Sequence, residues 1–188
     1  LHNYGQICKR DIRINDRIDI EKAGEVIPYV VGVAAGGRSQ DATTIVPPAR
    51  CPECGGPVEV EFGDLEAAGK PEDETGRFCL NPQCPAQVYE KLVWFAGRRQ
   101  MDIAGLGEQT IEQIRATKGV PLGTFADIYR LCHHRDALVA MDRMGEKKVE
   151  NLLAGIEASK SRGLGRLLGS LGIRHVGDTT AKLLARLF

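Results

Sequence analysis

The stretch Ile103-Ala104-Gly105-Leu106-Gly107-Glu108 has a pattern that returns twice, as Met141-Asp142-Arg143-Met144-Gly145-Glu146 and as Ile173-Arg174-His175-Val176-Gly177-Asp178. In each copy an apolar residue, two variable residues, a second apolar residue and a glycine precede an acid, and a helical apolar pattern follows. A glycine turn that leads into a helix directs unpaired backbone N–H groups outward. Three such hairpins predict an array of phosphate-binding points, and DNA is an array of phosphates.

The three copies differ at the tip of the hairpin. Only the first has two glycines, which allow the closest approach of backbone to ligand. Arg143 and His175 stand where the first copy has Gly105, so we expect these hairpins to bind less closely or to add a cationic side chain. We interpret the acid after each glycine as a complement to the helix dipole. The candidate phosphate-binding residues are the backbone at Gly105, Gly107, Gly145 and Gly177 and the side chains of Lys147, Lys148 and Arg174.

The charge of the chain is unevenly distributed, although its formal net charge is zero. Residues 1–50 hold seven Lys/Arg and six Asp/Glu, residues 51–85 hold two and eight, and residues 86–188 hold sixteen and eleven. The hairpins therefore lie in the basic segment, as binding to phosphate requires. A solvated helix surface with a modest excess of basic residues would give the same numbers.

Four cysteines form two pairs with the spacing of metal knuckles. Cys51 and Cys54 are separated by two residues, Cys79 and Cys84 by four, and the pairs by twenty-four. Four thiolates suit tetrahedral zinc and leave no position for water, so we predict a structural Zn²⁺ that stabilises a module with a small core. Two disulfides or four unrelated cysteines are the alternatives, and disulfides require an oxidising compartment.

The remaining cysteines stand apart from this module. Cys132-His133-His134 has ligand-type residues, but we interpret Cys132 as a small buried thiol beside two surface imidazoles. Cys8 has no ligand-spaced partner.

The periodicity separates a strand-rich first part from a helical second part. Residues 1–46 are predicted as strands, with a turn at Asn15-Asp16 and an edge strand or bulge at Pro28. Residues 58–62 alternate as a strand, and residues 63–76 are expected to form an exposed acidic loop. From Pro85 onward we expect helices, including one that ends at Gly97, a capping box at Thr124–Asp127, and apolar stripes over residues 149–156 and 164–171. No apolar run reaches the roughly 20 residues of a membrane helix.

Several stretches together resemble one family. They are Leu1-His2-Asn3, residues 22–28, Cys84-Pro85-Ala86-Gln87, residues 98–107 and residues 171–177. In this order, with the cysteine module and the hairpins, the chain is similar to the middle and later part of bacterial NAD-dependent DNA ligases.

The resemblance implies a multidomain α+β fold with three modules. Residues 1–48 would form a partial OB-fold β-barrel without its N-terminal strand, residues 49–85 a small four-cysteine zinc finger, and residues 86–188 an all-α helix-hairpin-helix domain. That domain carries four hairpins in the family and three here, so we expect the chain to be a fragment.

The resemblance also implies a function. The chain would encircle nicked double-stranded DNA and position it for an upstream adenylation domain that forms the phosphodiester bond, in a monomeric enzyme of the bacterial cytoplasm. NAD⁺ and Mg²⁺ would serve the parent enzyme at sites outside this chain. The family's Lys-x-Asp-Gly motif does not occur in these 188 residues, so we expect no ligation by them alone. Arg13 and Lys22 of the OB-fold are weaker candidates for DNA contact.

Two other functions are compatible with the sequence. A non-catalytic DNA-binding protein can also combine a zinc finger with hairpins, and a Lys-x-Asp-Gly motif upstream of Leu1 would distinguish the ligase from it. Alternatively, the hairpins are plain helix packing in a protein-interaction scaffold. Such a scaffold would not bind duplex DNA at low salt.

Overall fold

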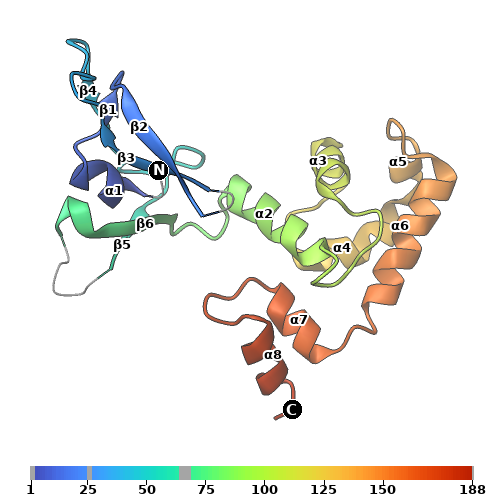
Figure 1. The fold of residues 1–188 in the computed structure, drawn as a ribbon. Helices are drawn as coiled ribbons and strands as arrows, with labels where there is room; N and C mark the ends of the chain where they lie inside the picture. The colour runs from blue at the N-terminus through green and yellow to red at the C-terminus, as the bar shows by residue number, and fades with distance from the viewer. Residues whose placement is uncertain (1–2, 25–26, 64–68, 188) are drawn as a thin grey trace. The chain divides into compact units, whose positions relative to one another are not determined.

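The computed structural model describes residues 3–24, 27–63 and 69–187. The chain divides into two compact units, Leu1–Cys84 and Pro85–Phe188, which are described separately below (Figure 1). The division falls where a helix begins with Pro85, a residue suited to the first helical position because it has no N–H to leave unpaired. The expected division into three domains, with a boundary after residue 48, stays a prediction.

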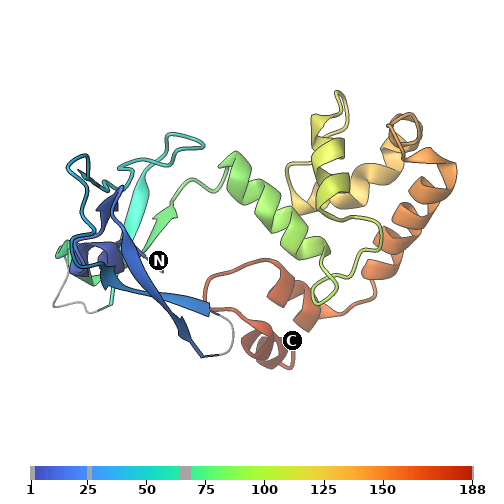
Figure 2. The same ribbon diagram turned by 45° about the horizontal axis from the view of Figure 1, so that its top comes forward.

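The first unit consists mainly of short antiparallel strand pairs. β2 and β3 form the longest ladder, in which Ile20 lies opposite Val30 and Lys22 opposite Pro28 (Figure 2). The predicted turn at Asn15-Asp16 is present, with Asn15 in the left-handed region at a φ of 71°. The elements of this unit are α1 (Tyr4–Lys9), β1 (Arg13–Ile14), β2 (Ile18–Ala23), β3 (Ile27–Val33), β4 (Thr43–Thr44), β5 (Val58–Phe62), the 3₁₀ helix η1 (Pro71–Asp73) and β6 (Glu74–Cys79).

One prediction for residues 1–48 needs correction, and the expected partial barrel can be followed only in part. The first residues of the described part form a helix and not a strand, because the Asn3 side chain accepts a hydrogen bond from Gln6 N and caps α1. The expected partial barrel is present only as separate ladders, β1 with β4 and β2 with β3. Closing a barrel requires a partner on both sides of each strand, and within the described residues each strand here has one.

The loop predicted for residues 63–76 is also wrong at its C-terminal end. Glu74 begins β6. This strand pairs with β5, which is the strand predicted at residues 58–62. Glu74 is only 4% exposed, and Arg77 binds both of its carboxylate oxygens at 2.7 and 2.8 Å. This ion pair neutralises a buried charge that would otherwise be costly. Residues 64–68 of the predicted loop lie outside the described residues.

The second unit is helical and contains the larger hydrophobic core. Phe95 stacks on Phe125 with 4.5 Å between ring centroids, and the buried faces of the helices surround this pair. The predicted stripe of α6 is confirmed, since Val149, Leu152 and Ile156 are buried. The helices are α2 (Pro85–Ala96), α3 (Glu108–Ala116), α4 (Phe125–Arg130), the 3₁₀ helix η2 (Leu131–His134), α5 (Arg135–Val139), α6 (Gly145–Ser159), α7 (Leu164–Ser170) and α8 (Asp178–Leu184).

Local signals set several helix ends as predicted. α2 ends at Ala96, directly before Gly97. The capping box of α4 is complete, because the Thr124 side chain accepts from Asp127 N while the Asp127 carboxylate accepts from Thr124 N. Burial alone would raise the pKa of Asp127, but the N–H groups of Gly123 and Thr124 outweigh it and hold the pKa below its usual value.

The helices α7 and α8 lie side by side at the end of this unit (Figures 1 and 2). Their contact depends on small residues, since a Cβ on Gly165 would lie 3.3 Å from the Cβ of Ala185. The stripe predicted over residues 164–171 is only partly correct: Leu167 and Leu171 pack against the core, whereas Leu164 is 42% exposed.

Candidate metal centre and nucleic-acid interface

The four paired cysteines lie together in the first unit. Their sulfur atoms are all within 4.8 Å of one another, with Cys51 Sγ 3.9 Å from Cys84 Sγ and Cys54 Sγ 3.6 Å from Cys79 Sγ. Zinc with Zn–S bonds of about 2.3 Å in a tetrahedron separates its sulfurs by about 3.8 Å, so the cluster fits zinc. These distances are far longer than the roughly 2.0 Å of a disulfide, which excludes the disulfide alternative in this structure.

Local backbone geometry brings the cysteines to this cluster. In the first knuckle Gly55 N donates to Cys51 O at 2.8 Å and Cys51 N donates to Gly56 O at 2.9 Å. Gly55 has a φ of +68°, a conformation that glycine adopts without strain. In the second knuckle β6 ends at Cys79, and a turn returns the chain to Cys84. The pairing of β5 with β6 then brings the two knuckles together.

The hydrogen bonds at the cluster prepare one thiol to bind a cation. The Asn81 side chain and the Gly56 N–H lower the pKa of Cys54 to about 6. The backbone of Asn81 also lowers the pKa of Cys79, but burial and the neighbouring Cys54 outweigh it and raise that pKa to about 11. A bound cation would lower the pKa of Cys79 in turn, because a coordinating thiol loses its proton.

The three hairpins of the second unit share one backbone turn. The third residue of each motif is left-handed, with φ of 86° at Gly105, 54° at Arg143 and 66° at His175. In each, the N–H of the fourth residue donates to the carbonyl of the first, at 3.2, 3.2 and 3.0 Å. Arg143 and His175 thus keep the turn of Gly105, at the cost of about 1–3 kcal/mol that a non-glycine residue carries there. Weaker phosphate binding by these two hairpins stays a prediction. Since the backbone turn is the same, its cause would be the bulk of the Arg143 and His175 side chains.

The glycine before the helix has a different position in the second hairpin. Gly107 and Gly177 are the extended N-caps of α3 and α8, with φ of −86° and −81°. Gly145, in contrast, is the first residue of α6, has a φ of +53° and follows Met144 as N-cap. The acid therefore opens the helix in two hairpins, as predicted, and is the second helical residue in the other.

The first hairpin leaves its helix N-terminus accessible. No side chain caps α3, and a Cβ added to the exposed Gly107 would meet nothing within 4 Å. α6 and α8 also begin without a side-chain cap, but so do α5 and α7. The uncapped end is therefore informative only together with the open glycine turn. Backbone N–H groups in this setting favour an anion.

The side chains predicted to bind DNA lie in different surroundings. Lys147 and Lys148 are exposed on the first turn of α6, where Lys148 Nζ donates to Arg143 O at 3.4 Å. Arg174 is exposed at the tip of the third hairpin.

The two candidates of the first unit differ from each other. Arg13 binds both carboxylate oxygens of Asp11 at 3.1 Å, so its guanidinium is already engaged. Lys22 is exposed on β2.

The first hairpin packs closely against α6. A Cβ on Gly155 would lie only 2.9 Å from Ala104 O and 3.1 Å from Ala104 N. A Cβ on Gly105 would lie 3.7 Å from Leu152 Cα. The absence of a side chain at Gly155 thus lets the first hairpin pack on α6. In the sequence, only a glycine inside a helical pattern indicates this contact.

Substituting Gly155 with alanine is expected to destabilise the second unit by about 1–3 kcal/mol, because the added methyl would displace the hairpin backbone. In an unobstructed helix the same change would stabilise by about 1 kcal/mol. Urea denaturation measures the difference, and Asn151→Ala, at an exposed position of the same helix, is the matched control. A Gly155→Ala protein more stable than the wild type would contradict the close contact.

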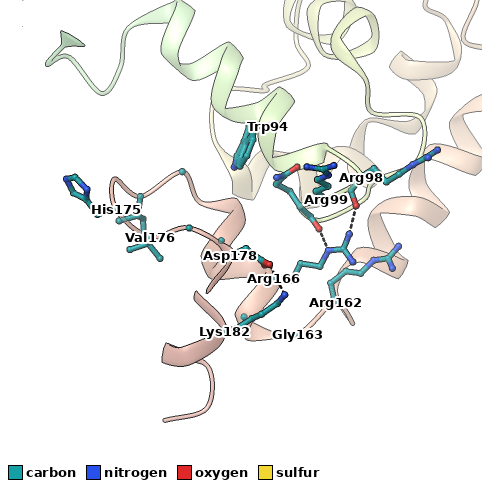
Figure 3. A pocket seen from close by; sticks show the side chains of 16 residues that line it. Trp94, Arg98, Arg99, Arg162, Gly163, Arg166, His175, Val176, Asp178 and Lys182 are labelled. Atoms are coloured by element: carbon teal, nitrogen blue, oxygen red, sulfur yellow. Dashed lines mark hydrogen bonds and ion pairs between the residues drawn. The ribbon is translucent and has the colours of Figure 1, made fainter. Parts of the chain in front are cut away.

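A basic groove of 1050 Å³ lies in the second unit between the end of α2, α7 and the third hairpin (Figure 3). Arg166 donates to the carbonyls of Gln100 and Arg98, and Arg162 Nη2 lies 2.8 Å from Asp102 Oδ2. Sequence reasoning missed this groove, because Arg98 and Arg99 lie more than sixty positions before Arg162 and Arg166. The groove is lined by Trp94, Arg98, Arg99, Gln100, Arg162, Gly163, Gly165, Arg166, Gly169, Gly172, Ile173, His175, Val176, Gly177, Asp178 and Lys182.

The residues around Cys132 do not form a second metal site. Cys132 is exposed, not buried as predicted, because it lies on the outer side of η2. Among the described residues, no group of metal-ligating side chains includes Cys132, His133 or His134. Cys8 is exposed as well.

Comparison with known proteins relates the chain to one enzyme family. Residues 1–42 match the model of the NAD-dependent DNA ligase OB-fold domain. The chain is 47% identical over 188 residues to a DNA ligase of Geobacter metallireducens and 47% identical over 189 residues to one of Chloroherpeton thalassium. The chain is homologous to part of a bacterial DNA ligase.

The similarity to DNA ligases extends over the whole chain but not over the whole relatives. All of the chain aligns with the Geobacter and Chloroherpeton ligases, and 98% of it with a ligase of Symbiobacterium thermophilum at 44% identity. It spans 26% of the length of each of them. The OB-fold match supports the family prediction, although the strands of the segment form only two-stranded ladders. No helix in the described parts is long and apolar enough to cross a bilayer.

Proposed function

We propose that this chain is the DNA-holding portion of an NAD-dependent DNA ligase. It binds nicked double-stranded DNA and positions the nick for an adenylation domain elsewhere in the same protein, in a monomeric enzyme of the bacterial cytoplasm. NAD⁺ and Mg²⁺ act at sites outside these residues. The chain alone does not ligate, because no Lys-x-Asp-Gly lysine is present to accept the adenylyl group.

The observation that carries the proposal is the repeated hairpin in a basic unit. The same left-handed turn occurs three times, and the first copy ends in an open glycine before an uncapped helix. Backbone N–H groups bind phosphate oxygens without reading the base sequence, which suits an enzyme that must act at any nick. On this proposal the second unit is a helix-hairpin-helix domain in which Gly105, Gly107, Gly145, Gly177, Lys147, Lys148 and Arg174 contact phosphates.

Zinc has a supporting role in the proposal. Cys51, Cys54, Cys79 and Cys84 hold the ion and make residues 49–85 a zinc finger. The ion cross-links the first knuckle to the β5–β6 hairpin and supplies no reaction chemistry, since sulfur fills all its positions. The ligase relatives favour this function over a non-catalytic zinc-finger and hairpin protein, because they align with the entire chain.

The test is the salt dependence of DNA binding by the full chain. A fluorescently labelled nicked duplex should bind, and the logarithm of the affinity should fall linearly with the logarithm of the salt concentration. If each hairpin neutralises at least one phosphate, the slope is about −3 or steeper. An absence of binding at low salt would exclude a DNA-holding role and leave the protein-interaction scaffold.

A further inference from the structure

The basic groove contains the chain's single tryptophan, Trp94. This side chain is not among the proposed contacts to duplex DNA. Trp94 is 51% exposed although it is the largest apolar side chain, and it points from α2 into the groove (Figure 3). The arginines lie on one side of it and the third hairpin on the other. An exposed indole among basic side chains offers a face on which a nucleic-acid base can stack.

The charge of the groove specifies an anionic partner. Five arginine and lysine residues line it. Lys182 pairs with Asp178 at 2.7 Å and Arg162 with Asp102 at 2.8 Å, which leaves the charges of Arg98, Arg99 and Arg166. The carbonyls that bind Arg166 do not neutralise its charge. Arg98 and Arg99 are exposed, and within the described parts of the chain neither pairs with a carboxylate.

The size of the groove indicates a partner thinner than a duplex. A volume of 1050 Å³ corresponds to the upper end of ordinary ligand pockets, of about 300–1,000 Å³. Such a groove takes a short flexible strand, whereas a double helix would only rest on its rim. Cations that follow a backbone and an aromatic face that stacks a base are the features that bind single-stranded nucleic acid.

We propose that this groove binds a short unpaired stretch of nucleic acid, with one base stacked on Trp94 and phosphates on Arg98 and Arg99. The site goes beyond the holding of duplex at the hairpins. It would accommodate the unpaired nucleotides of a gapped or frayed end beside the duplex. DNA and RNA strands share this chemistry, so the two are compared in the test.

The experiment uses the full chain and the fluorescence of Trp94, which is the only indole present. Oligothymidylate of about eight nucleotides should quench the fluorescence saturably, because a stacked base contacts the indole face. Anisotropy of a labelled oligothymidylate should show about 5- to 100-fold weaker binding by Trp94→Ala, as expected for the loss of one base stack, and nearly full recovery by Trp94→Phe. Arg99→Ala should weaken binding as well. Oligouridylate in parallel shows whether the groove prefers DNA or RNA.

Matched controls separate this site from the first hairpin, since the third hairpin itself lines the groove. Leu183→Ala and Arg130→Ala replace an exposed apolar and an exposed basic residue of the same unit outside the groove, and both should bind like the wild type. Gly107→Val should weaken binding of nicked duplex but not of the oligonucleotide. An oligonucleotide that leaves Trp94 unquenched, or binds Trp94→Ala and Arg99→Ala as tightly as the wild type, would overturn the proposal. Unchanged duplex binding in that case would leave the proposed function intact.

Discussion

Replacing Cys84 with alanine is expected to release zinc and unfold the first unit while the helical unit stays folded. The apolar residues buried within the described part of the first unit are Ile12, Cys51 and Cys84, and two of these are proposed metal ligands. A unit with so small a core depends on the metal, whose binding contributes about 10–16 kcal/mol in small zinc modules. Loss of one thiolate also leaves three buried or half-buried sulfurs without their common partner.

Metal content and hydrogen exchange measure this effect. The wild-type chain should hold one zinc ion per molecule, and Cys84→Ala should hold much less and lose amide protection in residues 3–24, 27–63 and 69–84. Cys8→Ala and Cys132→Ala, at exposed positions outside the cluster, are the matched controls and should keep both properties. Retention of one tightly bound zinc and unchanged protection in Cys84→Ala would refute a structural four-cysteine site. Chelation of the wild-type protein should reproduce the unfolding.

Replacing Gly107 with valine is expected to weaken binding of nicked duplex about 10- to 100-fold without loss of fold. The backbone of Gly107 is extended, with φ −86° and ψ 177°, and a Cβ meets nothing within 4 Å, so the variant can fold. The branched side chain would occupy the space in front of the α3 N-terminus and exclude a phosphate oxygen. One lost charge-assisted hydrogen bond of about 1.5–3 kcal/mol accounts for this range.

The binding measurement needs a thermal melt beside it, to show that the variant keeps the stability of the wild type. Gly123→Val is the matched control, since that glycine is also exposed and does not have a positive φ. A Cβ added there would meet only Asp127 Oδ2, at 4.0 Å. Gly177→Val extends the test to the third hairpin, whose N-cap has the same backbone conformation. Equal affinities of Gly107→Val and wild type would mean that the first hairpin does not contact phosphate.

Predictions that depended on short-range geometry were the reliable ones. Each cysteine knuckle is a local turn, and the capping box at Thr124 forms between neighbours. The pairing of β5 with β6 then brings the two knuckles together. The missed helix α1 had a short-range signal too, the Asn3 cap, but the apolar alternation that follows at Ile12 and Ile14 dominated the interpretation. No short-range signal marked Glu74 as buried. It is buried because α1 packs against β6, and Arg77 neutralises its charge there.

The sequence by itself therefore determined the elements that a few consecutive residues can specify: the cysteine knuckles, the hairpin turns and the amphipathic face of α6. It also carried the family resemblance. Only the tertiary structure decided which distant residues meet. Gly155 of α6 packs against the first hairpin. Arg162 and Arg166 bind Asp102 and Gln100 in the segment after α2, and these contacts form the groove around Trp94. The physical reason is that spacing along a chain fixes turns and helix faces, whereas contacts over sixty residues depend on how those faces pack.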